Sequence, residues 1–179
     1  MNLKKQKLAK AGEYETMIKA VRTTLISIAA LSVFGLGVAN ADIKQGDKLY
    51  AEGNYKDALQ QYVDAGGEGD VEATFRAAQM FEKGEGTGEP RYEKAVAWYQ
   101  VAARAGHLGA LHQLSDMFAE GRGVDADKVQ AWTLLNIAAN RGDAEAAKKR
   151  DALAADLRPG QLAAGERRTQ KLAPKYQGS

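Results

Sequence analysis

The sequence contains no cysteine, which excludes disulfide bonds, thiolate metal sites, cysteine nucleophiles and lipid-modified cysteines. It has only three prolines among 179 residues, so little in the composition opposes long helices. The longest apolar run, residues 25–38, is shorter than the roughly 20 residues that a membrane-spanning helix needs. There is no Gly-x-Ser-x-Gly nucleophile elbow and no cluster of serine, histidine and acid. These absences disfavour an enzyme.

The first 41 residues have the order of a secretory signal peptide. Lys19 and Arg22 form a basic flank, the apolar run follows, and Ala39-Asn40-Ala41 supplies the small-x-small cleavage pattern. We therefore expect a signal peptide over residues 1–41, cleaved at about Ala41/Asp42, and a periplasmic or secreted protein. Met17 could be the true start. An uncleaved membrane anchor is the alternative.

The basic charge of the chain belongs to this leader. Residues 42–179 carry 19 basic and 21 acidic residues, so nucleic acid is not an expected partner. The charge is uneven, because residues 42–147 have 11 basic and 18 acidic residues, whereas residues 148–179 have eight and three. The basic end could be a solvated helix face or could contact anionic lipid or polymer.

A repeat of about 37 residues organises the middle of the chain. Residues 73–86 resemble residues 110–123 at a spacing of 37, and both contain Met-Phe followed by Gly-x-Gly. Residues 95–106 resemble residues 131–142 at a spacing of 36. The array spans residues 42–147: a degenerate first unit at 46–72, then repeats at about 73–109 and 110–146. Residues 148–179 are expected to form a C-terminal helical cap and a flexible tail.

Each repeat predicts two helices that share a buried side. Small and large apolar residues recur on one helical face in both halves of each unit. A single helix pair cannot bury this stripe alone, but stacked pairs can. The sequence therefore predicts an all-α fold, a short α/α solenoid (superhelix) of seven or eight helices in antiparallel pairs. Glycines follow the predicted helices, where a left-handed residue is needed: Gly84, Gly106, Gly121 and Gly142.

The repeat resembles the Sel1-like repeat (SLR) family, a relative of the tetratricopeptide repeats. Gly121–Asp127 matches the loop of the family pattern, and Lys94–Ala103 with Gly106 matches its second helix. The resemblance covers about residues 46–147. The loop at 84–91 departs from the pattern by lacking the usual valine and aspartate, and Trp132 is shifted from its usual slot.

The residues that could carry chemistry have simpler explanations. His107 and His112 are five apart, off the i, i+4 spacing of a helical metal pair, so solvated or turn-capping roles are expected. The Gly-x-Gly pairs follow predicted helices, not strands, which disfavours a phosphate cradle. Asp125 and Asp127 do not fit a calcium loop and are expected to cap a helix. We expect no catalytic residue, no cofactor and no metal.

Three aromatic residues leave alternatives open. Trp98 and Tyr99 are expected in the core, although they could form a platform for a glycan or peptide. Trp132 could lie in the core or at a rim.

The resemblance implies a binding surface on the inner curve, lined by the first helix of each pair. By that analogy the partner-binding candidates are Arg76, Gln79, Lys83, Gln113, Asp116 and Glu120, and Trp132 is a further candidate because it could lie at a rim. We expect a monomeric adaptor or scaffold for a protein or peptide partner in the bacterial envelope. A binder of peptidoglycan or another envelope glycan is the alternative, and a hydrolytic enzyme the weaker one.

Overall fold

The computed structural model describes residues 43–178, and the expected signal peptide lies outside them. Within that range the chain forms eight α-helices and one short 3-10 helix, with no strand. The elements are α2 (Ile43–Ala51), α3 (Tyr55–Gly67), α4 (Val71–Lys83), α5 (Tyr92–Arg104), α6 (Leu108–Glu120), α7 (Lys128–Asn140), α8 (Ala144–Ala154), α9 (Pro159–Leu172) and η1 (Ala173–Tyr176).

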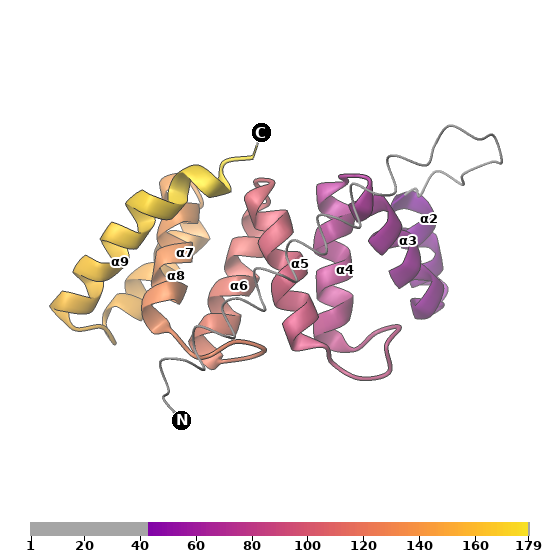
Figure 1. Ribbon diagram of the computed structural model, residues 1–179, viewed down its shortest axis with the longest axis horizontal. Coiled ribbons are helices and arrows are strands. Elements are labelled where there is room, and N and C mark those ends of the chain that lie inside the picture. Colours follow the sequence, from indigo (N-terminus) through magenta and orange to yellow (C-terminus); the bar gives the residue numbers. More distant parts are fainter. Residues whose placement is uncertain (1–42, 179) are drawn as a thin grey trace, which may run out of the picture.

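The helices stack in a single row of pairs (Figure 1). Helix α2 packs on α3, α4 on α5 and α6 on α7, and each pair packs on the next through α3 with α4, α5 with α6 and α7 with α8. We call α2, α4, α6 and α8 the first helices, and α3, α5 and α7 the second helices. The predicted all-α solenoid is confirmed.

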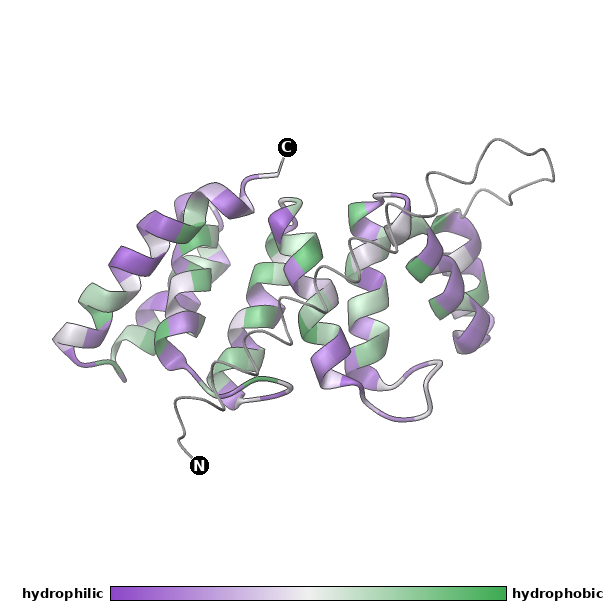
Figure 2. Ribbon diagram, viewed as in Figure 1, coloured by the Kyte–Doolittle hydropathy of each residue, from purple (hydrophilic) through white to green (hydrophobic). Residues whose placement is uncertain are grey.

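The core lies where the apolar sides of neighbouring pairs meet. Hydrophobic and hydrophilic residues share every helix, as expected for helices that bury one side (Figure 2). The small residues Ala77 and Ala110 are fully buried and let the backbones approach, while Leu114 and Leu134 fill the space between them. Each such leucine contributes roughly 2 kcal/mol of hydrophobic free energy. The repeated apolar stripe is therefore buried between neighbouring helix pairs, as predicted.

The first glycine of each Gly-x-Gly pair ends a first helix. Gly84 and Gly121 have φ angles of 78° and 76°, in the left-handed region that glycine adopts without steric cost. Each donates its backbone N–H to a methionine carbonyl in the last turn, Met80 or Met117. The helix stops predicted at these positions are confirmed.

The second glycine of each pair sets the spacing between units. A Cβ atom on Gly86 would lie 2.6 Å from the carbonyl oxygen of Tyr55, and one on Gly123 would lie 2.5 Å from the carbonyl carbon of Tyr92. Both contacts join the loop after a first helix to the start of the preceding second helix. The second glycine of the motif therefore allows neighbouring units to pack closely, since only glycine permits this backbone approach.

Side chains cap the N-termini of the later helices. Asp70, Asp127 and Asp143 accept backbone N–H groups at the starts of α4, α7 and α8. His107 has the same role for α6, where its Nδ1 accepts the Ala110 N–H at 3.1 Å. The expected capping roles of His107 and Asp127 are thus confirmed, whereas Asp125 is exposed and caps no helix.

The C-terminal cap covers Trp132. Helix α9 packs on α7, and Gly165 lies so close to the indole that a Cβ atom there would be 2.6 Å from Trp132 Cε3. Trp132 is only 7% exposed, and its Nε1 has no hydrogen-bond partner among the described residues. The question left open by the sequence is answered: Trp132 is a core residue, and it is unavailable to a partner while α9 covers it.

The end of the chain is also packed down. Tyr176 is 7% exposed, and Arg141 donates to the carbonyl oxygens of Tyr176 at 3.0 Å and of Gly106 at 2.8 Å. Residues 173–176 form η1, which contacts α9 and α5, so this part of the expected tail is folded; its flexibility stays a prediction. The expected boundary at 147/148 falls inside α8.

Candidate functional site

An open cleft of about 330 Å³ lies between α4 and α6. It is lined by polar side chains from both first helices, from α5 and from the loop after α6: Gln79, Glu82, Lys83, Tyr92, Tyr99, Gln113 and Arg122. A smaller hollow of about 60 Å³ adjoins it toward α2, and the two share Gln79 and Lys83. The smaller hollow adds Tyr50, Tyr62, Arg76, Met80 and Glu85. Together these residues form what we call the first-helix groove.

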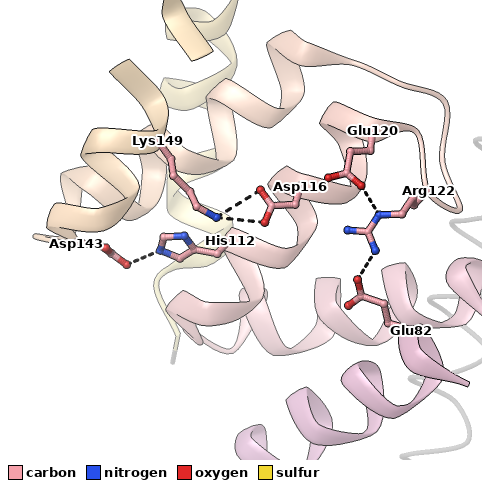
Figure 3. Close-up of polar contacts among 7 residues, drawn as sticks. All are labelled: Glu82, His112, Asp116, Glu120, Arg122, Asp143 and Lys149. Atoms are coloured by element: carbon pink, nitrogen blue, oxygen red, sulfur yellow. Dashed lines mark hydrogen bonds and ion pairs between the residues drawn. The ribbon is translucent and has the colours of Figure 1, made fainter. Parts of the chain in front are cut away.

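At one end of the groove, a buried tyrosine and an arginine form hydrogen bonds that join α4, α5 and the loop after α6. The Tyr99 ring is fully buried, and its hydroxyl donates to Glu82 Oε2 at 2.6 Å. Burial and the bond to Glu82 raise the pKa of Tyr99. Arg122 donates to the other oxygen of Glu82 and, through Nε, to Glu120 Oε2 at 2.6 Å (Figure 3). Although burial opposes its charge, these two carboxylates raise the pKa of Arg122.

The opposite end of the α4/α6 contact is held by a second charged group. Glu72, in the first turn of α4, lies 3.1 Å from His107 Nε2 and accepts from Arg76 Nε at 2.9 Å. Burial raises the pKa of Glu72, but the bonds from His107 and Arg76 outweigh burial and lower it overall. Since His107 also stacks on Phe75 with ring centroids 4.0 Å apart, this end is rigidly tied. The groove therefore lies between two polar ties.

The next contact along the array, between α6 and α8, is bridged instead. His112 Nε2 lies 2.8 Å from Asp143 Oδ2, and Lys149 Nζ lies 3.2 Å from Asp116 Oδ2 (Figure 3). Bonds from the Ala146 N–H and from His112 lower the pKa of Asp143. Of these two contacts between first helices, α4/α6 contains an open cleft and α6/α8 is bridged by side chains.

The structure gathers four of the predicted partner-binding residues in the groove: Arg76, Gln79, Lys83 and Gln113. Asp116 and Glu120 lie on the same helix, α6, but are engaged by Lys149 and Arg122. Trp132 lies under α9, away from this surface. The placement fits the predicted surface; whether these residues bind a partner stays a prediction.

Several groove residues were missed from the sequence. Glu82 does not recur, because the equivalent position one repeat later is Ala119, and Arg122 lies in a loop whose glycines dominate the pattern. Tyr50 and Tyr62 come from the degenerate first unit, where the periodic signal is weak. The only signal in the sequence was that Glu82 and Arg122 are about one repeat apart, which in a stacked array brings the ends of adjacent first helices together.

Metal binding, membrane spanning and sugar stacking find little support in the described residues. Between Ile43 and Gly178, no three histidine or acidic side chains come together as metal ligands would. In the same part of the chain, no helix combines the length and the apolar character needed to cross a membrane. The rings of Trp98, Tyr99 and Trp132 are at most 9% exposed, so none of the three offers a face for stacking a sugar.

Comparison with known proteins agrees with the fold. The family model described as Sel1 repeat matches residues 71–107 and 109–143. No curated protein matches the chain. Among solved structures, the chain is similar to a protective antigen present in uropathogenic Escherichia coli strains that displays an SLR fold, with 26% sequence identity and a TM-score of 0.69. The match covers 75% of this chain and 29% of that one, so this chain spans less than a third of its length.

Proposed function

The chain contains Sel1 repeats and has an SLR-like fold, and on that premise we propose that it is a non-catalytic adaptor that holds a segment of a protein partner in the first-helix groove. SLR arrays are helical scaffolds suited to protein interactions. One observation carries the assignment to this surface: side chains from two successive repeats converge on a single groove. The groove offers contacts for a partner, and its two hydroxyl–carboxylate pairs, Tyr99 with Glu82 and Tyr50 with Glu85, join neighbouring elements of the array.

We further propose that the adaptor works outside the cytoplasm of a bacterium. The support is the order of basic flank, apolar run and Ala-x-Ala in residues 1–41. Mass spectrometry of the protein purified from cells that express the full chain tests this. We expect the polypeptide to begin at about Asp42. A chain that keeps residues 17–41 would favour the anchor instead.

Site-specific photocrosslinking in the native host tests the adaptor role. A photoreactive amino acid would replace Gln113, which lines the groove, or Glu93, which is exposed on the second helix α5. We expect a discrete crosslinked species of defined mass from position 113 and none from position 93. Equal crosslinking from both positions, or none from either, would count against a partner held in the groove.

The glycan alternative receives less support from the structure than the protein partner. The three aromatic residues that suggested a sugar-stacking platform, Trp98, Tyr99 and Trp132, are all buried. We therefore favour the protein partner over peptidoglycan. Sedimentation with purified peptidoglycan is the corresponding check, and we expect the protein to stay in the supernatant.

A further inference from the structure

We propose, building on the adaptor function, that the groove grips the main chain of an extended, uncharged segment through the carboxamides of Gln79 and Gln113. The partner is thus recognised chiefly by its peptide groups. Its charged side chains, where it has them, point away from the groove. The argument rests on which groups in the groove are engaged and which are unengaged.

Among the described residues, the carboxamides of Gln79 and Gln113 and the Tyr92 hydroxyl line the cleft without a hydrogen-bond partner, and of these only the carboxamides have both the donors and the acceptor of a peptide group. Gln79 comes from α4 and Gln113 from α6, and both are half-buried. Within residues 43–178 neither side chain has a hydrogen-bond partner, whereas the neighbouring Glu82 has two. A carboxamide offers an acceptor and donors like those of a peptide group, so it can pair with an N–H and a C=O of a passing chain. Two such groups on adjacent helices fit one extended segment.

Most of the charged side chains around the groove are paired with a side chain of opposite sign. Arg122 faces Glu82 and Glu120, and Arg76 faces Glu72. Lys83 and Glu85, of opposite sign, both lie against the Tyr50 hydroxyl. A charged ligand group would have to displace one of these partners, and it would gain little, because the pair it breaks is lost. The lining therefore favours an uncharged segment.

Selection from a random peptide library tests this inference. The peptides would have about 12 residues, which extend over roughly 40 Å at about 3.3 Å per residue. The library would be panned against the wild-type protein, purified from cells that express the full chain. Selected clones would then be assayed on Q79A/Q113A and on the matched control Q100A/Q130A. The control removes two half-buried glutamines from the second helices α5 and α7.

We expect clones with few charged residues that bind wild type and the control alike. Their Kd should rise at least about tenfold on Q79A/Q113A, since two hydrogen-bonding groups are removed. It should change less than about threefold between low and high salt, because no net charge is paired on binding. The double variant should keep its melting temperature, since neither carboxamide has a bond to lose within the described residues.

Three outcomes would overturn the inference. Clones that bind Q79A/Q113A as tightly as wild type would place the contact elsewhere and leave the adaptor function standing. Clones with a strong net charge and steeply salt-dependent Kd would show that charge, not the main chain, is recognised. Failure to select any clone would remove both the inference and a peptide-binding adaptor.

Discussion

Two of the contacts between successive first helices, α4/α6 and α6/α8, use equivalent positions in different ways. At 37 residues apart, Gln79 in α4 corresponds to Asp116 in α6. Gln79 faces an open cleft and has no partner among residues 43–178, whereas Asp116 is bridged to Lys149 of α8. The polar side chain is therefore unpaired in one repeat, whereas in the next repeat it is paired with a side chain of the adjacent helix. On the proposed function, partner binding would depend on which side chains remain unpaired and not on the repeat itself.

We expect the largest effect on stability from a substitution in the loop after α6, which carries Arg122. Replacing Gly123 with alanine places a methyl group 2.5 Å from the Tyr92 backbone at a φ of 70°. The loop must move, and with it Arg122, which ties the groove. We expect a loss of about 3 kcal/mol or more in the free energy of unfolding, measured by urea denaturation.

Gly88→Ala is the matched control for that substitution. Gly88 also has a left-handed φ, 82°, but a Cβ atom there would meet nothing within 4 Å. Only the backbone strain remains, so we expect about 1 kcal/mol. Equal losses for both variants would show that the close approach at Gly123 does not hold the units in register.

Tyr99→Phe weakens the open contact without disturbing its packing. The substitution removes the hydroxyl that donates to Glu82 at 2.6 Å and leaves a partly buried carboxylate oxygen unpaired. We expect a loss of about 1–2 kcal/mol in the free energy of unfolding by thermal or urea denaturation. Tyr50→Phe should cost less, because Tyr50 and its acceptor Glu85 are more exposed. Equal costs would contradict the tie assigned to Tyr99.

The contribution of the α6/α8 contact to the free energy of unfolding should depend on pH. The folded-state pKa of Asp143 is lowered, so the unfolded chain binds this proton first as pH falls. The contribution of Asp143 is complete above its ordinary pKa of about 3.9 and is lost as pH falls through the lower folded value. Asp143→Asn keeps a capping side chain. Its free energy of unfolding should therefore fall less than that of wild type between about pH 5 and pH 3. Parallel curves would exclude this role.

Lys149→Ala is expected to have the smallest effect. Its ammonium and the Asp116 carboxylate are both more than a third exposed, so water and salt screen the pair. We expect a loss of less than about 1 kcal/mol in the free energy of unfolding, and less again in high salt. Nevertheless the variant leaves Asp116 as unpaired as Gln79. A loss that grows with salt would contradict an electrostatic bridge.

The parts of the fold that repeat were predictable from the sequence. The helix stops at Gly84 and Gly121 and the buried stripe through Ala77 and Leu114 follow from periodicity alone. Four of the predicted binding residues also lie together, because a stacked array brings equivalent positions of adjacent first helices side by side.

The parts that do not repeat were not predictable. The ion pair between Glu82 and Arg122 joins residues 40 apart, one of them in a loop, and has no counterpart at Ala119. The burial of Trp132 depends on the path of α9, which leans on α7 because Gly165 lets the two helices approach closely. Such contacts depend on three-dimensional placement, which a repeat period does not specify outside the repeat.

The side-chain NH₂ resonances of glutamine provide the most direct measurement of the central claim, that the α4/α6 groove is the binding surface. In ¹⁵N-labelled protein titrated with a selected peptide, the account predicts that the resonances of Gln79 and Gln113 shift with saturation. Those of Gln100 and Gln130, on the second helices, should stay in place. Saturable shifts at Gln100 or Gln130 with none at Gln79 and Gln113 would contradict the account.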